Sequence, residues 1–158
     1  MYLIMTTILV ALLSAPLLAP PRVVVSLAKA TNRTVAIRIE NASSQEMALS
    51  ATTYVALLKP DAPDQHMPLY WAKVEDQSVP TTSQPLRVLG RKSSTAHVDP
   101  RSLSWSRDRA GLTPEQPIGR VVLPGDYELQ VQIVDEEQNW WRSAEMPVTV
   151  STNGDLRF

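Results

Sequence analysis

The sequence contains no cysteine, and this absence removes several ways of stabilising or anchoring an exported protein. No disulfide framework can form, and a lipid-modified N-terminal cysteine of the bacterial lipoprotein type is excluded. The hydrophobic core must therefore hold the fold together. A chain of 158 residues favours one domain. Once an N-terminal segment is removed, roughly 138 residues remain, which is enough to bury about two-thirds of the unfolded chain's surface.

Histidine is also scarce, which limits the chemistry open to the chain. The only two, His66 and His97, lie far apart in the sequence. The Asp61–His66 segment lacks a second histidine at ligand spacing, and Asp135–Glu137 lacks the Asp/Asn-rich loop of a calcium site. No G-x-S-x-G elbow is present. We therefore expect no catalytic residues, no metal and no cofactor. A net charge of −1 offers no basic stripe for nucleic acid.

Charge is missing altogether from Met1–Pro21. Ile8–Ala19 is a twelve-residue apolar run of the length found in a signal-peptide h-region. No Lys or Arg precedes it, and Leu3–Ala19 reaches the lower edge of a spanning helix. A cleaved signal peptide is the first interpretation, an N-terminal membrane anchor the second and a buried core helix the third. In either of the first two cases the protein is secreted or periplasmic, and residues 1–21 form an apolar helix.

Alternating apolar residues mark the stretch Leu123–Val150 as a closing antiparallel hairpin. Its turn is Leu123-Pro124-Gly125-Asp126, where Pro fixes φ and Gly tolerates positive φ. Apolar residues then recur at every second position from Tyr127 to Ile133, as in a half-buried strand. Asp135–Asn139 reverses the chain, and a second strand runs through Met146, Val148 and Val150.

The rest of the chain shows short strand patterns separated by Pro-rich connectors, which predicts an all-β sandwich of seven to nine strands over residues 22–152. Residues 153–158 are expected to be a tail. Earlier strands are predicted at Val23–Leu27, Val35–Ile39, Thr52–Lys59, Leu69–Glu75, Pro85–Lys92 and Ser102–Ser106, and Arg120–Leu123 is either a short strand or the approach to the hairpin. The connectors are Pro60–Pro68, Pro80–Pro85 and Asp108–Gly119.

The Pro124-Gly125-Asp126-Tyr127 motif resembles the start of the penultimate strand of immunoglobulin-like domains. By this resemblance Tyr127 is a structural corner residue whose hydroxyl bonds upstream backbone, and Leu129 occupies the place of the second cysteine of antibody domains. Trp71 or Trp105 would be the inward tryptophan of a middle strand. The chain is similar to small exported immunoglobulin-like domains of bacteria, with intracellular proteinase-inhibitor-type domains as one family candidate. The resemblance implies an antiparallel sandwich fold and carries no function.

Two adjacent tryptophans offer the best candidate for a contact surface. Counting back from Val150 by twos places Trp140 towards the core and Trp141 outwards with Ser143 and Glu145, unless a bulge near Pro147 resets the register. Trp141 and Arg142, together with Trp71, are therefore the predicted binding residues. The corresponding hypothesis is a non-catalytic module that binds a protein partner, with the Pro-rich loops at its edge.

Three other functions stay open on the sequence. A protease inhibitor would present a stiff Pro-rich loop to a protease. A hydrolase would need acidic side chains that converge in a pocket, at least one with a shifted pKa. An assembly module would pair an exposed edge strand with a client. The sequons at Asn32 and Asn41 are interpreted as ordinary turns.

Overall fold

The computed structural model describes residues 23–42, 47–49, 51–60, 68–74, 86–88, 92–109, 117–135 and 137–158. The N-terminal apolar segment, His66 and most of the Pro-rich connectors lie outside these residues. Within them, no helix is both long enough and apolar enough to cross a membrane.

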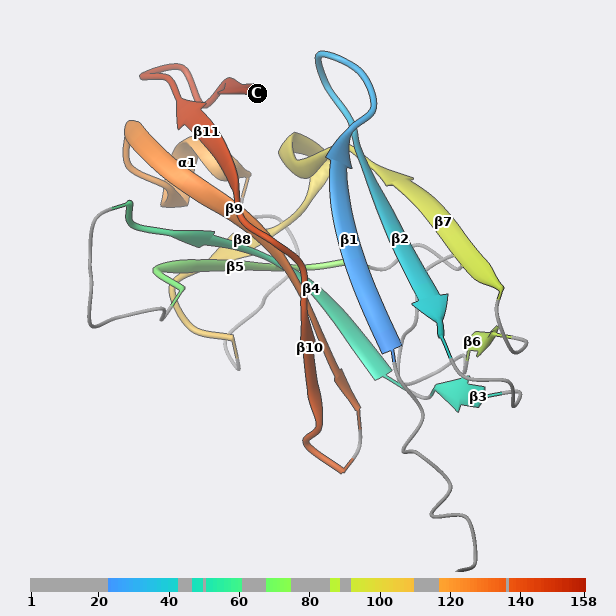
Figure 1. Ribbon diagram of the computed structural model, residues 1–158. Coiled ribbons are helices and arrows are strands. Elements are labelled where there is room, and N and C mark those ends of the chain that lie inside the picture. Colours follow the sequence, from blue (N-terminus) through green and yellow to red (C-terminus); the bar gives the residue numbers. More distant parts are fainter. Residues whose placement is uncertain are drawn as a thin grey trace, which may run out of the picture.

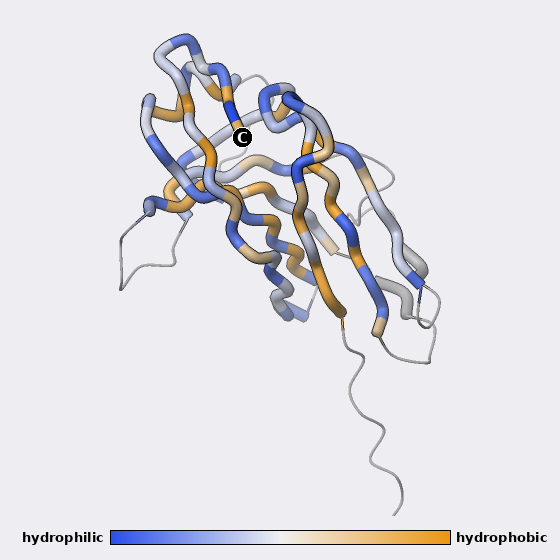
Figure 2. Tube along the Cα trace, turned by 45° about the horizontal axis from the view of Figure 1, so that its top comes forward, coloured by the Kyte–Doolittle hydropathy of each residue, from blue (hydrophilic) through white to orange (hydrophobic). Residues whose placement is uncertain are grey.

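A three-stranded antiparallel sheet is built from β1 (Val23–Lys29), β2 (Val35–Asn41) and β7 (Ser93–Val98), with β2 in the centre. The central strand alternates as predicted: Val35 and Ile37 are buried, whereas Arg38 is exposed and forms a 3.1 Å ion pair with Glu40. Figure 2 shows hydrophobic and hydrophilic residues alternating along this region. Asn41, expected in a turn, instead ends β2 and is fully buried.

A seven-stranded antiparallel sheet forms the larger layer. Its order is β12 (Leu156–Arg157), β11 (Met146–Val150), β9 (Gly125–Asp135), β4 (Ala51–Leu58), β5 (Tyr70–Lys73) and β8 (Trp105–Ser106), and β10 (Trp140–Arg142) also pairs with β9. A separate two-stranded sheet joins β3 (Met47–Leu49) to β6 (Leu86–Val88). The predicted closing hairpin is confirmed, since β9 pairs antiparallel with β10 and β11 on one side and with β4 on the other.

Figure 1 shows β1, β2 and β7 as a group of strands separate from the larger sheet, and one hydrophobic core joins the two. The smaller sheet contributes Ile37 and Ile39, and the larger sheet contributes Leu129 and Ile133, all at most 2% exposed. Two antiparallel layers that share a core are compatible with a β-sandwich. The all-β prediction is therefore confirmed at this level.

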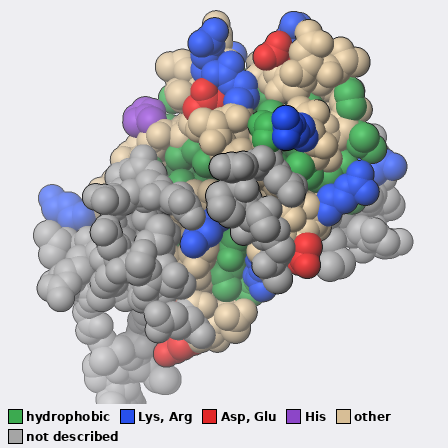
Figure 3. All heavy atoms as spheres, turned by 180° about the vertical axis from the view of Figure 1, so that it is seen from behind, with side chains coloured by type: hydrophobic (Ala, Val, Ile, Leu, Met, Phe, Trp, Pro, Cys, Tyr) green, Lys and Arg blue, Asp and Glu red, His purple; other side chains and the backbone are tan. Residues whose placement is uncertain are grey.

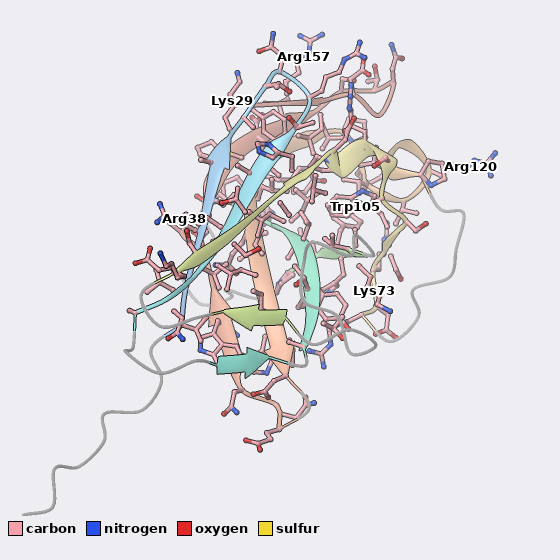
Figure 4. The ribbon with its side chains drawn as sticks, turned by 90° about the vertical axis from the view of Figure 1, so that its right-hand side faces the viewer. Lys29, Arg38, Lys73, Trp105, Arg120 and Arg157 are labelled. Carbon is pink, nitrogen blue, oxygen red and sulfur yellow. The ribbon has the colours of Figure 1, made fainter. Side chains whose placement is uncertain are left out.

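Trp105 is the largest fully buried side chain of this core among the described residues. It is 1% exposed, and its indole Nε1 donates a 2.8 Å hydrogen bond to the Pro100 carbonyl. Figure 4 shows Trp105 within the body of the molecule, whereas Arg120 projects from its edge. Of the two tryptophans considered for the inward position, Trp105 is the buried one, and Trp71 is half-buried.

Three segments differ from the sequence prediction. The strand expected over Ser102–Ser106 shortens to β8, because Asp99 caps a 3₁₀ turn at Pro100–Ser102 by accepting from the Arg101 amide. The approach to the hairpin contains one helical turn, α1 (Ile118–Val121), instead of a strand. Residues 153–158 were predicted to be a tail, but they contain β12, which pairs with β11 and buries Leu156.

Candidate functional site

The outer face of the seven-stranded sheet is the side turned away from the shared core, and it carries an unusual set of aromatic residues. On β9 the odd-numbered Leu129, Val131 and Ile133 belong to the core, so Gln130 and Gln132 lie on the outer face. By the same alternation, Tyr54 on β4, Trp71 on β5 and Trp140 on β10 share that face. They are brought together from three strands far apart in sequence.

The three outer rings contact one another edge to face. The centroids of Tyr54 and Trp71 lie 5.8 Å apart at 83°, and those of Trp71 and Trp140 lie 6.4 Å apart at 61°. Edge-to-face pairs at these distances are attractive, because the positive edge of one ring meets the negative face of the other. We call these three residues the aromatic cluster. Each member is half-buried.

The guanidinium of Arg109 lies against all three rings of the aromatic cluster. Its Cζ is 4.6 Å from the Trp140 centroid and 5.8 Å from those of Tyr54 and Trp71. Arg142, which is exposed, lies over Trp140 at 5.5 Å. Several ring faces around one cation form a cation–π site. Figure 3 shows hydrophobic side chains next to Lys and Arg side chains on the face seen from behind.

A buried chain of hydrogen bonds runs beside the aromatic cluster. Gln132 Nε2 donates to Gln130 Oε1 at 2.6 Å, and Gln130 Nε2 donates to the Ser143 carbonyl at 3.3 Å. A carbonyl only accepts, so this order fixes both amide orientations and leaves Gln132 Oε1 as an acceptor. Among the described residues that atom has no partner, and neither does Arg109 Nη1, although both are buried.

The structure corrects the predicted orientation of the two adjacent tryptophans. Trp141 packs against the core cluster, opposite the fully buried Ile133, whereas Trp140 lies on the outer face. The reason is a change of register. Arg142 pairs with Gln132, but Met146 pairs with Leu129, so three residues on one strand face two on β9. This one-residue bulge reverses the alternation between β10 and β11.

Ser143 holds the bulge in place. Its Oγ accepts from the Val131 amide at 2.9 Å and donates to the Ala144 carbonyl at 2.7 Å, and its own amide donates to the Val131 carbonyl. The side chain is 5% exposed, so it replaces ladder hydrogen bonds in a place that water barely reaches. Ser143 was expected to point outwards, and this expectation was wrong.

Of the three predicted binding residues, two meet on the outer face. Trp71 and Arg142 both contact Trp140, whereas Trp141 is on the opposite side of the sheet. Sequence reasoning missed Tyr54, Arg109 and Trp140. The alternation that places Tyr54 and Trp71 on a face of their strands could have been followed in the sequence. Placing Trp140 required knowledge of the bulge. Arg109 lies outside any described strand.

The corner residues lie at the start of β9. Tyr127 is buried, and its hydroxyl donates a 2.8 Å hydrogen bond to the Leu123 carbonyl, which is the contact expected for a corner tyrosine. Gly125 follows Pro124 with φ of 154°, a value that favours glycine. Burial, with the adjacent Tyr70 hydroxyl, raises the pKa of Tyr127 to about 12. The phenol therefore stays protonated as a donor well above neutral pH.

A groove of about 610 Å³ lies between the Asp99–Ser102 turn, α1 and the loop at residues 152–155. Asp99 accepts from Arg101 Nε at 2.8 Å, and this hydrogen bond holds the pKa of the Asp99 carboxyl below its usual range. A general acid needs a raised carboxyl pKa, and the pKa of Asp99 is shifted in the opposite direction. Gly154, at φ 77°, closes the groove tightly, because a Cβ there would lie 2.6 Å from Gly119 Cα.

The metal candidates do not assemble in the part of the chain that the structure describes. His97 is exposed on β7, and no group of three or more His, Cys, Asp or Glu side chains is placed to hold an ion among those residues. At the hairpin tip, Asp135 accepts from the amide and the side chain of Asn139, so its carboxylate closes the turn.

No protein-family model matches the chain, and no curated protein matches it either. The aromatic cluster, its two arginines and the glutamine pair therefore have to be interpreted from their own geometry.

Proposed function

We propose that this chain is a non-catalytic binding module whose contact surface is the outer face around Trp71, Trp140 and Arg142. The observation that carries the proposal is the clustering of half-buried aromatic rings with an exposed arginine on one face. Aromatic residues and Arg are enriched at protein contact surfaces, where they supply much of the binding energy. The proposed partner is therefore a protein.

The immunoglobulin-like form of the fold and the localisation outside the cytoplasm are part of the same proposal. The corner hydrogen bond from Tyr127 to Leu123 supports an immunoglobulin-like form of the sandwich. The charge-free apolar segment Met1–Pro21 supports export, with the protein released or tethered at its N-terminus. N-terminal sequencing of the protein recovered outside the cytoplasm tests this localisation, and recovery of the chain only from the cytoplasm would oppose it.

A capture experiment tests the proposed surface. The double substitution Trp140→Ala and Arg142→Ala is expected to weaken retention of the partner by about tenfold or more, since central aromatic and Arg side chains dominate such contacts. Retention from an extracytoplasmic extract is measured by quantitative mass spectrometry, with circular dichroism to establish that the variant is folded.

The matched control is Leu123→Ala. Leu123 is a large apolar residue that is 59% exposed at the approach to the hairpin, away from the aromatic cluster. The control is expected to retain the same proteins as the wild type. Equal capture by the wild type, the control and the double variant would rule out this surface.

A further inference from the structure

The aromatic cluster is a cation site that is already occupied. Three rings from three strands surround the Arg109 guanidinium, with the nearest ring centroid 4.6 Å away. Several aromatic faces around a cation are the arrangement by which proteins recognise cationic ligands. In the free chain the occupant comes from the protein's own loop, three residues after the end of β8.

Arg109 leaves hydrogen-bonding groups in and near its site without partners. Arg109 Nη1 is a buried donor without an acceptor, and Gln132 Oε1 is a buried acceptor without a donor, among the described residues. Gln132 is 1% exposed and lies opposite Tyr54 on β4 and Arg142 on β10, in the same row of the outer face. A donor and an acceptor buried in one region normally satisfy each other. Arg109 and Gln132 do not make this hydrogen bond, so Gln132 Oε1 stays open to another donor.

We propose that the aromatic cluster and Gln132 form a receptor for a partner's arginine side chain, and that Arg109 fills this receptor until the partner displaces it. The inference rests on the proposed binding function and names the group that the surface binds. An incoming guanidinium is not tied to the loop after β8, so it can donate to Gln132 Oε1. The released Arg109 gains water as an acceptor.

The charge of the site does not oppose this exchange. Arg142 already lies 5.5 Å from the centroid of Trp140, the ring that Arg109 also contacts. Replacing one guanidinium by another leaves the charge near the ring unchanged, provided that Arg109 moves into solvent. A net gain in binding free energy therefore depends on the hydrogen bond to Gln132 and on the fit of the incoming guanidinium between the rings.

Opening the site by mutation tests the inference with purified protein and needs no known partner. Methylguanidinium is titrated into Arg109→Ala while the indole N–H signals of Trp71 and Trp140 are followed by NMR. We expect the probe to bind at least about tenfold more tightly than to the wild type. Adding Trp140→Ala or Gln132→Leu to Arg109→Ala is expected to abolish that gain.

Arg107→Ala is the matched control. Arg107 is two residues away and contacts a single ring, Tyr70, at 5.8 Å. It is expected to bind methylguanidinium no better than the wild type. Equal binding by the wild type and Arg109→Ala would overturn the proposal, and so would equally tight binding of methylammonium, since that probe lacks the planar donors. Because the titration requires no partner, its failure is distinct from failure of the capture experiment.

Discussion

Replacing Trp105 by alanine is expected to lower the free energy of unfolding by about 3–5 kcal/mol. The indole is 1% exposed between the two sheets and donates to the Pro100 carbonyl at 2.8 Å. The substitution removes its apolar contacts, leaves a cavity and deprives that carbonyl of its donor. Urea unfolding followed by circular dichroism measures the change.

Trp71→Ala is the comparison for this prediction. Trp71 has the same side chain but is half-buried on the outer face, so its truncation is expected to cost less than half as much as that of Trp105. Equal losses for the two variants would mean that Trp105 is not buried in the core that joins the two sheets, and the two-layer packing would then be wrong.

Ser143→Ala is expected to destabilise the fold by about 1–3 kcal/mol, although it deletes a single oxygen atom. The hydroxyl accepts from the Val131 amide and donates to the Ala144 carbonyl inside the bulge. Without it, a buried N–H group has no acceptor, and water reaches the site poorly because Ser143 is 5% exposed. The change is measured by urea unfolding at constant pH.

Thr149→Ala is the matched control, because it also removes a hydroxyl, here from β11, the strand that follows the bulge. Thr149 Oγ1 bonds Asp126 Oδ1 at 2.7 Å, but it is exposed, so water replaces the contact. The expected change is within about 0.5 kcal/mol. A Ser143→Ala variant as stable as this control would show that the bulge does not depend on the hydroxyl.

The sequence predicted those parts of the fold whose pattern is local. Alternation at Val35–Ile39 and at Tyr127–Ile133 is set by side chains that must face one core, and both strands were found. The turn at Asp99–Ser102 was not predicted, because its cause is the capping of one helical turn by the Asp99 carboxylate. Residue propensities alone cannot decide whether such a segment forms a capped helical turn or a short strand.

The candidate site was less accessible to sequence reasoning. Trp71 and Arg142 were selected, but Trp141 was chosen in place of Trp140 because the count by twos was carried through Ser143–Glu145. One extra residue in a strand moves every later side chain to the opposite face of the sheet, and no local sequence signal marks that residue. Arg109 reaches the aromatic cluster from outside the strands, so no periodicity marks it.

The most direct test of the outer-face arrangement is a measurement of ring-to-ring nuclear Overhauser effects in the wild-type protein. We expect contacts from Trp71 to both Trp140 and Tyr54, whose ring centroids lie 6.4 and 5.8 Å away, and none from Trp71 to Trp141. Contacts between Trp71 and Trp141, with Trp140 instead touching core residues, would contradict it.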